Sequence, residues 1–416
     1  MSLEQKQKVL SALAGGAERV FELQSKLTSL RGLGPDNGGT GEQDKADYLE
    51  GWLRSFGITN IEHVDAPDAR VPSGKRPNLI VRVPGKSEKT LWILGHMDVV
   101  PAGDESLWRP DPWTVTRDEN DPDLIYGRGI EDNQQAIVCG CMVAAALKEQ
   151  GVTPDLSLGL IFVADEETGN AYGIHHLLKE RPNFVKEGDL VMVPDSGSPD
   201  GTFIEVAEKG ILWLRVTVQG QQCHASKPDD GKNALVGAAA MILGAAEVEK
   251  KFDQRNDIFS PNRSTFTPSK HEANVPNVNT MPGREVFYID CRVLPCYTLD
   301  EVVEAFRELG ARVSEKYGVD VDVQIQTYAP AAAPTPEDSA VVVALRKAVK
   351  EVLGVECWCG GVGGSTVAVS FRERGIPAAV WAHIFENCHT PNEAARLSFA
   401  VGDAQVYASM LFNDGE

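Results

Sequence analysis

The chain has 416 residues, of which 42% are hydrophobic, so it can bury sizeable cores and two domains are expected. Its formal net charge of -20 disfavours binding to nucleic-acid phosphates or to an anionic membrane surface. No apolar run reaches the roughly 18 residues that span a bilayer, and the polar N-terminal segment lacks the apolar stretch of a secretory signal. We therefore expect a cytoplasmic protein with reduced cysteines.

The first half of the chain alternates between expected strands and helices. Three apolar runs that end in polar or charged residues are expected to be buried strands: residues 91–98, 157–167 and 189–197. Residues 133–150 and 171–180 are expected to be helices, and Gly151 ends the first of them. Apolar strands that alternate with helices are typical of a mostly parallel sheet covered by helices on both faces.

The pattern changes after Gly210. Residues 211–220 alternate between apolar and polar side chains, as a half-exposed strand does. With this strand, the following segments predict the order β-α-β-β-α-β: a helix at 232–251, strands at 264–270 and 284–295, a helix at 299–317 and a strand at 321–330. That order is typical of a ferredoxin-like α+β unit.

The rest of the chain returns to the first pattern. The proline- and alanine-rich residues 329–338 are interpreted as a linker. The segments after it are expected to be a helix at 339–353, a glycine-rich loop at 359–368, a strand at 378–385 and a last helix from about residue 391. We therefore expect an α/β domain, residues 1–208 and 329–416, that is interrupted by a smaller α+β domain at 209–328.

Acidic residues and a histidine follow the expected strands. His96 and Asp98 follow the first strand, Glu166 and Glu167 follow the second, and Asp195 follows the third. Open parallel sheets bind ligands at the carboxyl ends of their strands, so the fold class would bring these residues together.

Two further candidates lie at the start of an element. Asp132 begins the helix at 133–150, and His389 follows the last expected strand, directly after Cys388, whose thiol is interpreted as incidental. Each candidate also has an ordinary interpretation, such as a helix cap, a hydrogen-bonded pair or a solvated turn. The grouping of all of them is harder to explain in those terms.

The charge of this group favours bound cations. Two like charges 4 Å apart repel by about 4 kcal/mol at an effective dielectric near 20. Several such pairs would rival the stability of a domain, which is about 5–15 kcal/mol. Mixed histidine and carboxylate ligands suit Zn²⁺ and related divalent ions.

Seven motifs occur in an order that resembles a known family. They are GHMDVVP, YGRGIEDN, FVADEETG, VPDSG, CHASKPDDGKNA, NTMPG followed by DCR, and CHTPNE. The chain resembles the dinuclear-zinc amidohydrolases and peptidases, among them succinyl-diaminopimelate desuccinylase, acetylornithine deacetylase, aminoacylase, glutamate carboxypeptidase and carnosinase-type dipeptidases. The resemblance covers nearly the whole chain.

The resemblance implies two divalent metal ions, zinc first and cobalt or manganese as alternatives. His96 and Asp195 would bind one ion, Glu167 and His389 would bind the other, and Asp132 would bridge them. Asp98 would orient His96. Glu166 would be the general base, and the Asp132–Asn133 peptide bond would be cis.

The resemblance also assigns roles in the smaller domain, as a lid and a dimerisation domain. His224 would stabilise the oxyanion at the neighbouring subunit's site of a homodimer. Asn279 and Arg292 would hold the substrate carboxylate, for which a guanidinium is well shaped. Gly364 and Ser365 in the glycine-rich loop would face the substrate.

The implied function is the hydrolysis of an amide bond in a small dipeptide or peptide-like substrate with a free carboxylate. The alternative within the family is an N-acyl amino acid deacylase, of the desuccinylase or deacetylase type. Three departures favour a peptide substrate: aspartate at 195, Val367 where many deacylases have aspartate, and Asn133-Gln134 where other members have Met-Lys. A non-catalytic scaffold or sensor is the remote third hypothesis, disfavoured because every ligand and Glu166 are present.

Overall fold

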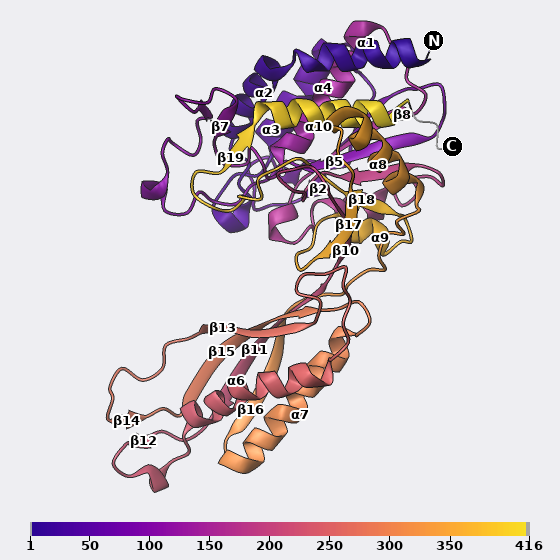
Figure 1. Ribbon diagram of the computed structural model, residues 1–416. Coiled ribbons are helices and arrows are strands. Elements are labelled where there is room, and N and C mark those ends of the chain that lie inside the picture. The colour runs from indigo at the N-terminus through magenta and orange to yellow at the C-terminus, as the bar shows by residue number, and fades with distance from the viewer. Residues whose placement is uncertain (1, 413–416) are drawn as a thin grey trace. The chain divides into compact units, whose positions relative to one another are not determined.

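A computed structural model describes residues 2–412, which form two compact units (Figure 1). The larger unit consists of a segment that ends at Val206, the segment Thr335–Cys359, and a segment that starts at Thr366. The smaller unit consists of Ala207–Pro334 and Gly360–Ser365. Residues 329–334 and 360–365, which the sequence analysis assigned to the larger domain, group with the smaller unit.

An eight-stranded sheet, most of whose residues belong to the larger unit, has the order β1-β4-β8-β5-β9-β18-β10-β17. Its strands are β1 Ile61–His63, β4 Leu79–Val83, β8 Ser157–Val163, β5 Thr90–His96, β9 Leu190–Val193, β18 Ala378–Val380, β10 Phe203–Glu208 and β17 Trp358–Val362. The four central strands β8, β5, β9 and β18 are parallel, whereas β4 and β10 join them antiparallel. The expected α/β fold with a mostly parallel sheet is therefore confirmed.

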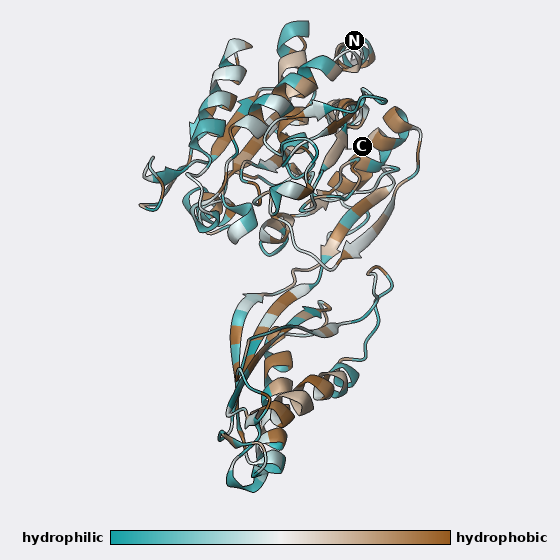
Figure 2. Cartoon of the chain, turned by 90° about the vertical axis from the view of Figure 1, so that its left-hand side faces the viewer, coloured by the Kyte–Doolittle hydropathy of each residue, from teal (hydrophilic) through white to brown (hydrophobic). Residues whose placement is uncertain are grey.

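Helices cover both faces of this sheet because its strands are apolar on both sides. Leu91 and Ile93 of β5 pack into one core cluster, and the alternate residues Trp92 and Leu94 pack into another. The first cluster contains α1 Ser2–Ala14, α2 Ala17–Ser29, α3 Gln43–Ser55, α4 Gln134–Gln150, α8 Ala340–Leu353 and α10 Leu397–Met410. The second contains α5 Ile174–Glu180 and α9 Ala368–Arg372. Figure 2 shows brown strands enclosed by helices whose outer residues are teal.

The smaller unit is the expected ferredoxin-like arrangement. Its elements are β11 Gly210–Gln219, α6 Ala234–Lys251, β13 Thr265–His271, β15 Arg284–Val293, α7 Leu299–Tyr317 and β16 Asp320–Ala329, with sheet order β13-β15-β11-β16. A capping box between Thr298 and Glu301 begins α7, and Gly318 ends it in the left-handed conformation. A separate two-stranded antiparallel sheet is formed by β12 Cys223–His224 and β14 Thr280–Met281, next to the turn η4 Pro228–Asp230.

Short elements complete the larger unit. They are the strands β2 Ala66–Pro67, β3 Lys75–Arg76, β6 Thr116–Arg117, β7 Leu124–Tyr126 and β19 Ala394–Arg396, and the 3-10 turns η1 Pro35–Asn37, η2 Glu105–Leu107 and η3 Glu166–Thr168.

Four predicted bounds are wrong by four residues or more. The strands expected at 157–167, 189–197 and 378–385 end at Val163, Val193 and Val380. The last helix begins at Leu397 rather than near residue 391, because Ala394–Arg396 pair with β7 instead. The partner of Ala394–Arg396 is distant in sequence, so local periodicity carried no signal for this pairing.

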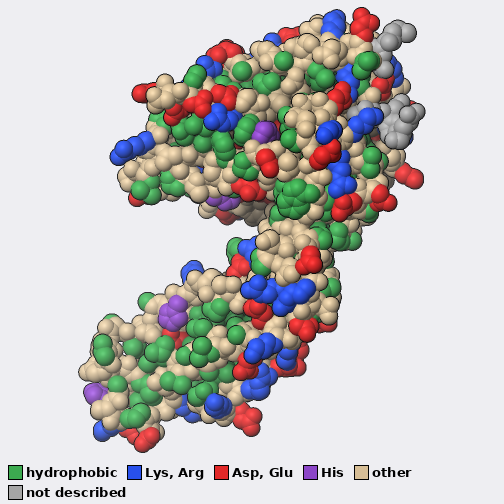
Figure 3. Space-filling view, viewed as in Figure 1, with side chains coloured by type: hydrophobic (Ala, Val, Ile, Leu, Met, Phe, Trp, Pro, Cys, Tyr) green, Lys and Arg blue, Asp and Glu red, His purple; other side chains and the backbone are tan. Residues whose placement is uncertain are grey.

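Among residues 2–412, no helix is both long and apolar enough to cross a membrane. Figure 3 shows both acidic and basic side chains on the visible face of each unit.

Candidate metal centre and active site

The predicted site residues of the larger unit lie at the carboxyl ends of three adjacent parallel strands. His96 ends β5 and Asp98 follows it, Glu166 and Glu167 follow β8, and Asp195 follows β9. Parallel pairing aligns these ends, since His96 lies beside the last residue of β8 in the register.

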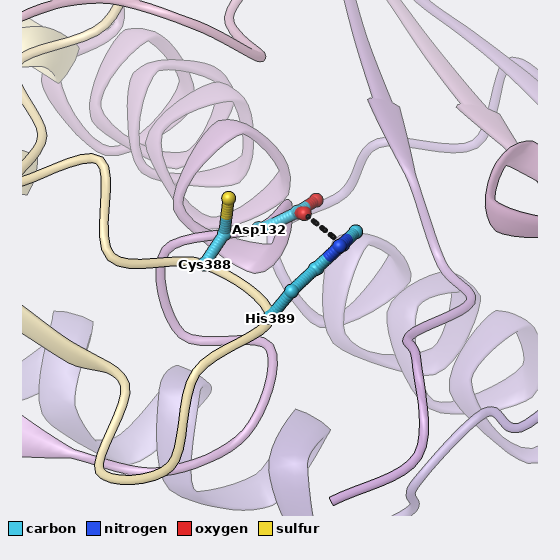
Figure 4. A group of neighbouring side chains, drawn as sticks. All are labelled: Asp132, Cys388 and His389. Atoms are coloured by element: carbon cyan, nitrogen blue, oxygen red, sulfur yellow. Dashed lines mark ion pairs between the residues drawn. The ribbon is translucent and has the colours of Figure 1, made fainter. Parts of the chain in front are cut away.

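Asp132 contacts two histidines, and Figure 4 shows its pairing with His389. Its Oδ1 atom is 2.9 Å from Nε2 of His96, and its Oδ2 atom is 3.1 Å from Nε2 of His389. Asp195 approaches His96 to 3.5 Å, and Glu167 approaches His389 to 3.2 Å. The five side chains therefore form two pairs that share one carboxylate.

These spacings fit bound divalent ions. Two ligand atoms that are each about 2.0–2.1 Å from one ion, at angles between 90° and tetrahedral, lie about 2.9–3.4 Å apart. The donor set of two imidazoles and three carboxylates suits Zn²⁺, and it also suits other divalent ions of the first transition row. The two oxygens of Asp132 face different histidines, as a bridging ligand requires.

The surroundings of His96 leave its Nε2 atom available to a metal. The Nδ1 atom lies 3.0 Å from the backbone carbonyl oxygen of Asp98 and 3.5 Å from its carboxylate. A carbonyl oxygen can only accept, so in the neutral ring Nδ1 carries the proton and Nε2 has the lone pair. Asp98 thus reaches His96 more closely through its backbone than through the carboxylate that the sequence indicated.

The carboxylate of Asp98 instead holds the turn that carries the two glutamates. It accepts hydrogen bonds of 3.0 Å from the backbone N–H groups of Glu166 and Glu167. These bonds fix the backbone from which both glutamate side chains project. Asp98 therefore links the ends of β5 and β8.

Glu166 and Glu167 do not lie on an extended backbone, as the sequence interpretation assumed. Asp165 has a left-handed conformation with φ of 63°, and η3 (Glu166–Thr168) begins directly after it. Asp165, to which the sequence assigned no role, is buried, accepts a 3.0 Å hydrogen bond from the backbone N–H of Tyr172, and pairs with the buried Arg76. The turn, not strand alternation, separates the two glutamates.

The charges in the site shift several protonation equilibria. Loss of solvation raises the pKa of Glu166 well above its usual range, and the charges of Asp195 and Glu167 act in the same direction against the attraction of His96. Hydrogen bonds to Asp132 and then to Glu167 raise the pKa of His389 to about 10. The carboxylates therefore outweigh the available cations of the protein, which favours bound metal.

Asn133 connects three parts of the site, and the sequence analysis gave its side chain no role. Its Oδ1 atom accepts a 3.2 Å hydrogen bond from the backbone N–H of His96. Its Nδ2 group donates to the carbonyl of Pro194 at 2.7 Å and to Asp195 at 2.6 Å. The Asp132–Asn133 peptide bond is cis, as the resemblance implied.

Glu393 is a second residue that the sequence analysis missed. Its carboxylate is fully buried and accepts hydrogen bonds from the backbone N–H groups of Gly129, Glu131 and Asp132 at 2.9, 2.9 and 3.2 Å. It also pairs with the buried guanidinium of Arg128 at 2.7 Å. Glu393 thereby fixes the backbone in front of Asp132.

Glu131 makes the reciprocal contact. Its carboxylate accepts 2.8 Å hydrogen bonds from the backbone N–H groups of Phe385 and Asn387, in the loop that leads to His389. Burial, the largest cause, raises the pKa of Glu131 to about 7. Both acids stand inside motifs quoted above, Glu131 directly before Asp132 and Glu393 four residues after His389, and that position was the available sequence signal.

Cys388 lies closer to the site than its interpretation as incidental suggests. Its sulfur and ligand atoms of Asp132 and His389 all lie within 4.8 Å of one another, and Figure 4 shows the three side chains together. Burial raises the pKa of its thiol to about 12. The neutral thiol is therefore the stable form in the protein alone.

The predicted residues of the smaller unit form two groups. His224 is exposed in β12, beside the start of β14, and the backbone carbonyl of Asn279 accepts a 2.9 Å hydrogen bond from Ala225. Arg292 lies toward the opposite end of β15 and donates to the carbonyl of Gly363 at 2.8 Å. The structure therefore associates Arg292 with the glycine-rich loop that contains Gly364 and Ser365.

Comparison with known proteins identifies the family. The chain is 37% identical over 413 residues to an uncharacterized metallohydrolase of Methanococcus maripaludis, covering 95% of this chain and 99% of that protein. It is 25% identical over 360 residues to a succinyl-diaminopimelate desuccinylase of Magnetococcus marinus, covering 85% and 90%. A di-peptidase from Saccharomyces cerevisiae has the same fold, with a TM-score of 0.76 at 18% identity and 98% coverage of both chains. Residues 92–413 match Peptidase family M20/M25/M40, so the chain belongs to this family and is a metal-dependent hydrolase, as the motifs indicated.

Proposed function

We propose that the protein hydrolyses the amide bond of a small dipeptide or peptide-like substrate that has a free carboxylate. The main support is the arrangement in which the two oxygens of Asp132 face His96 and His389, in the same site as the half-buried Glu166. In this proposal Asp195 shares one divalent ion with His96, and Glu167 shares the other with His389. Zinc suits these ligands first, with cobalt or manganese as alternatives.

Glu166 is the proposed general base and then the proposed general acid. A divalent ion pair, when bound, supplies Lewis acidity and a water of lowered pKa. Glu166 takes the proton of the attacking water and later gives it to the leaving amine. Loss of solvation raises the pKa of Glu166 in the protein alone, which favours its proton-bearing form and supports its proposed role as a proton carrier.

The smaller unit is proposed to supply further substrate contacts. His224 is the candidate for oxyanion stabilisation, and Asn279, Arg292, Gly364 and Ser365 are candidates for binding the substrate. His224 is exposed, as a group that reaches a neighbouring subunit must be. These roles come from the family resemblance.

The peptide substrate is favoured over an N-acyl amino acid by residues at two positions. Asp195 matches the dipeptidase and aminopeptidase pattern. Val367, where many deacylases have aspartate, is fully buried in an apolar cluster, so its side chain offers no contact to a polar acyl group. The deacylase alternative is supported by the relatives named succinyl-diaminopimelate desuccinylase.

A substrate panel separates these two functions. The purified protein is reconstituted with zinc, cobalt or manganese, and turnover is measured on free-amine dipeptides and on N-acetyl and N-succinyl amino acids. Faster turnover of dipeptides supports the proposal, and faster turnover of N-acyl amino acids favours the deacylase. Absence of turnover on the whole panel contradicts both.

A Glu166→Gln variant tests the base. We expect its bound metal, measured by elemental analysis, to equal that of the wild type, while kcat falls by a factor of about 10²–10⁴. Glu119→Gln, at an exposed acid of the same unit, is the control and should retain activity. Near-wild-type turnover of the Glu166 variant would show that another group moves the proton.

A homodimer formed through the smaller unit is also proposed. Leu235, Val236 and Leu243 of α6 are exposed, with Leu243 76% accessible, and Figure 3 shows apolar side chains gathered over this helix. A Leu243→Glu variant should sediment as a monomer if this face is the interface.

A cytoplasmic location is proposed because all eight cysteines are free thiols.

A further inference from the structure

The sheet of the smaller unit has one covered face and one open face. Its apolar residues pack against α6 and α7 in a single core cluster, and alternate residues of β11 are accordingly buried. Trp213 of β11 and Asp290 of β15 are register partners on the other face, where Trp213 is 45% exposed. Arg292 lies two residues after Asp290, so its side chain is on the same open face.

Three hydrogen bonds hold Arg292 in one orientation. Its Nε and Nη2 groups donate to the two carboxylate oxygens of Asp290 at 2.7 and 3.0 Å, and Nη1 donates to the carbonyl of Gly363 at 2.8 Å. The indole Nε1–H of Trp213 in turn donates to Asp290 at 2.8 Å. The guanidinium is thus fixed to the sheet on one side and to the glycine-rich loop on the other.

We propose that Asp290, held by Trp213, is a positioning residue that orients Arg292 to receive the carboxylate of the substrate. This inference rests on the proposed function, in which Arg292 binds that carboxylate. A guanidinium has five N–H donors, and among the described residues three are used, so two remain for a ligand. A fork whose plane is fixed beforehand loses less conformational freedom when a carboxylate binds.

There is also room beside this group. A hollow of about 400 Å³ on the open face is lined by Trp213, Lys270, Tyr288 and Asp290 among others. Lys270 lies over the ring of Tyr288 at 4.9 Å, so the hollow has an aromatic wall and a positive charge. The anionic end of a small peptide suits a hollow that has both this aromatic wall and the positive charge of Lys270.

An ordinary surface ion pair does not explain these contacts. The side chains of Arg292 and Asp290 are 29% and 26% exposed, and an isolated pair of that kind gains little from its charge alone. The hydrogen bonds with Trp213 and Gly363 fix the directions of the Asp290 and Arg292 side chains and add no charge. Asp290 also reduces the net positive charge near Arg292, so its benefit to an anionic ligand must come from orientation.

The experiment compares two substrates that differ only in charge. The best substrate of the panel and its C-terminal carboxamide are assayed with metal-loaded wild type, Asp290→Asn and Trp213→Phe. Trp213→Phe keeps both charges and an aromatic ring, and it removes the N–H that holds Asp290. Asp290→Glu, which keeps the charge, is included as the conservative variant.

We expect KM for the carboxylate substrate to rise by about tenfold to a hundredfold in Asp290→Asn, with kcat little changed, because a charge-assisted contact is misaligned. Trp213→Phe should show a smaller rise, Asp290→Glu should recover part of the loss, and the carboxamide should be unaffected. Glu272→Gln is the control, because Glu272 lies on the same face but bonds Tyr288 and Arg215 instead.

An equal loss on both substrates would assign Asp290 a purely structural role and overturn the inference, as would unchanged discrimination between them. A wild type that does not distinguish the carboxylate from the carboxamide would overturn it too. Absence of turnover on the whole panel would instead contradict the proposed function itself, on which the inference rests.

Discussion

Replacement of Glu393 by glutamine tests how strongly the metal centre depends on its buried support. One carboxylate oxygen of Glu393 accepts from the backbone N–H groups of Glu131 and Asp132, and the other accepts from Gly129 and Arg128. Glutamine has the same size, but its NH₂ group must face donors on one of these two sides. At least two hydrogen bonds are therefore lost, and the charge of Arg128 loses its partner.

The magnitude follows from burial. The side chains of Arg128 and Glu393 are 2% and 0% exposed, so the remaining guanidinium cannot be rescued by bulk water. Removing one partner of a buried pair costs about 3–5 kcal/mol. That is a large part of the about 5–15 kcal/mol that stabilises a typical domain. Since Glu393 holds the backbone N–H of Asp132, metal affinity should also fall by about 10–100-fold, as it does for other residues that orient ligands.

The assay uses urea unfolding of the metal-free proteins, so that bound metal does not add to the stability, together with metal titration against a competing chelator. Glu119→Gln is the matched control, because that side chain is exposed and should stay within about 0.5 kcal/mol of the wild type. An unfolding free energy of the Glu393 variant within 1 kcal/mol of the wild type, or unchanged metal affinity, would refute this account; the threshold is about a third of the smallest expected cost.

The remaining predictions concern a buried acid and a close backbone approach. Burial raises the pKa of Asp403 to about 8, from 3.8. The folded state therefore holds a proton that the unfolded state releases between these values, and stability should fall with rising pH by up to about 1.4 kcal/mol per unit in that window. Asp403→Asn should flatten this slope in denaturation series at pH 5 to 8, about the window that the two pKa values bound, and an unchanged slope would assign it to other groups. A Cβ on Gly197 would meet the carbonyl oxygen of Ala382 at 1.8 Å, so Gly197→Ala should destabilise by at least about 1–3 kcal/mol and weaken metal binding through Asp195. Gly51→Ala, at an open site in α3, is its control in thermal unfolding and should be neutral or stabilising.

The hydrogen bonds of Glu393 and Glu131 explain in part why the site accommodates so many acidic side chains. Glu393 and Glu131 neutralise part of their charge through backbone N–H groups, which also orient the loops of Asp132 and His389. The carboxylate of Asp98 likewise accepts a hydrogen bond from the backbone N–H of Glu166 and orients that turn. The acids that support the site are therefore hydrogen-bonded to the chain, and the acids that face the metal positions pair with histidine.

Much of this protein was predictable from local patterns. Apolar runs located β5, β8 and β9, and the helix periodicity with Gly151 located α4, because both signals lie within one element. Ordered motifs identified the family, which the comparisons confirmed. The residues that the structure brings together around Asp132 are those that the strand ends indicated, whereas their roles as ligands and base stay predictions.

By itself the sequence determined the element types, the α/β class and the chemistry of the strand ends, since alternation and motif residues are local properties of the chain. Only the tertiary structure decided which groups support the site. Glu393 bonds residues 261 to 265 positions away, and the partners of Asp98 and Asn133 lie on other elements. The tertiary structure also has a turn at Glu166 and Glu167, where the sequence predicted an extended backbone. The physical reason is that a buried carboxylate takes whichever N–H groups the fold presents to it, and local sequence patterns do not encode that choice.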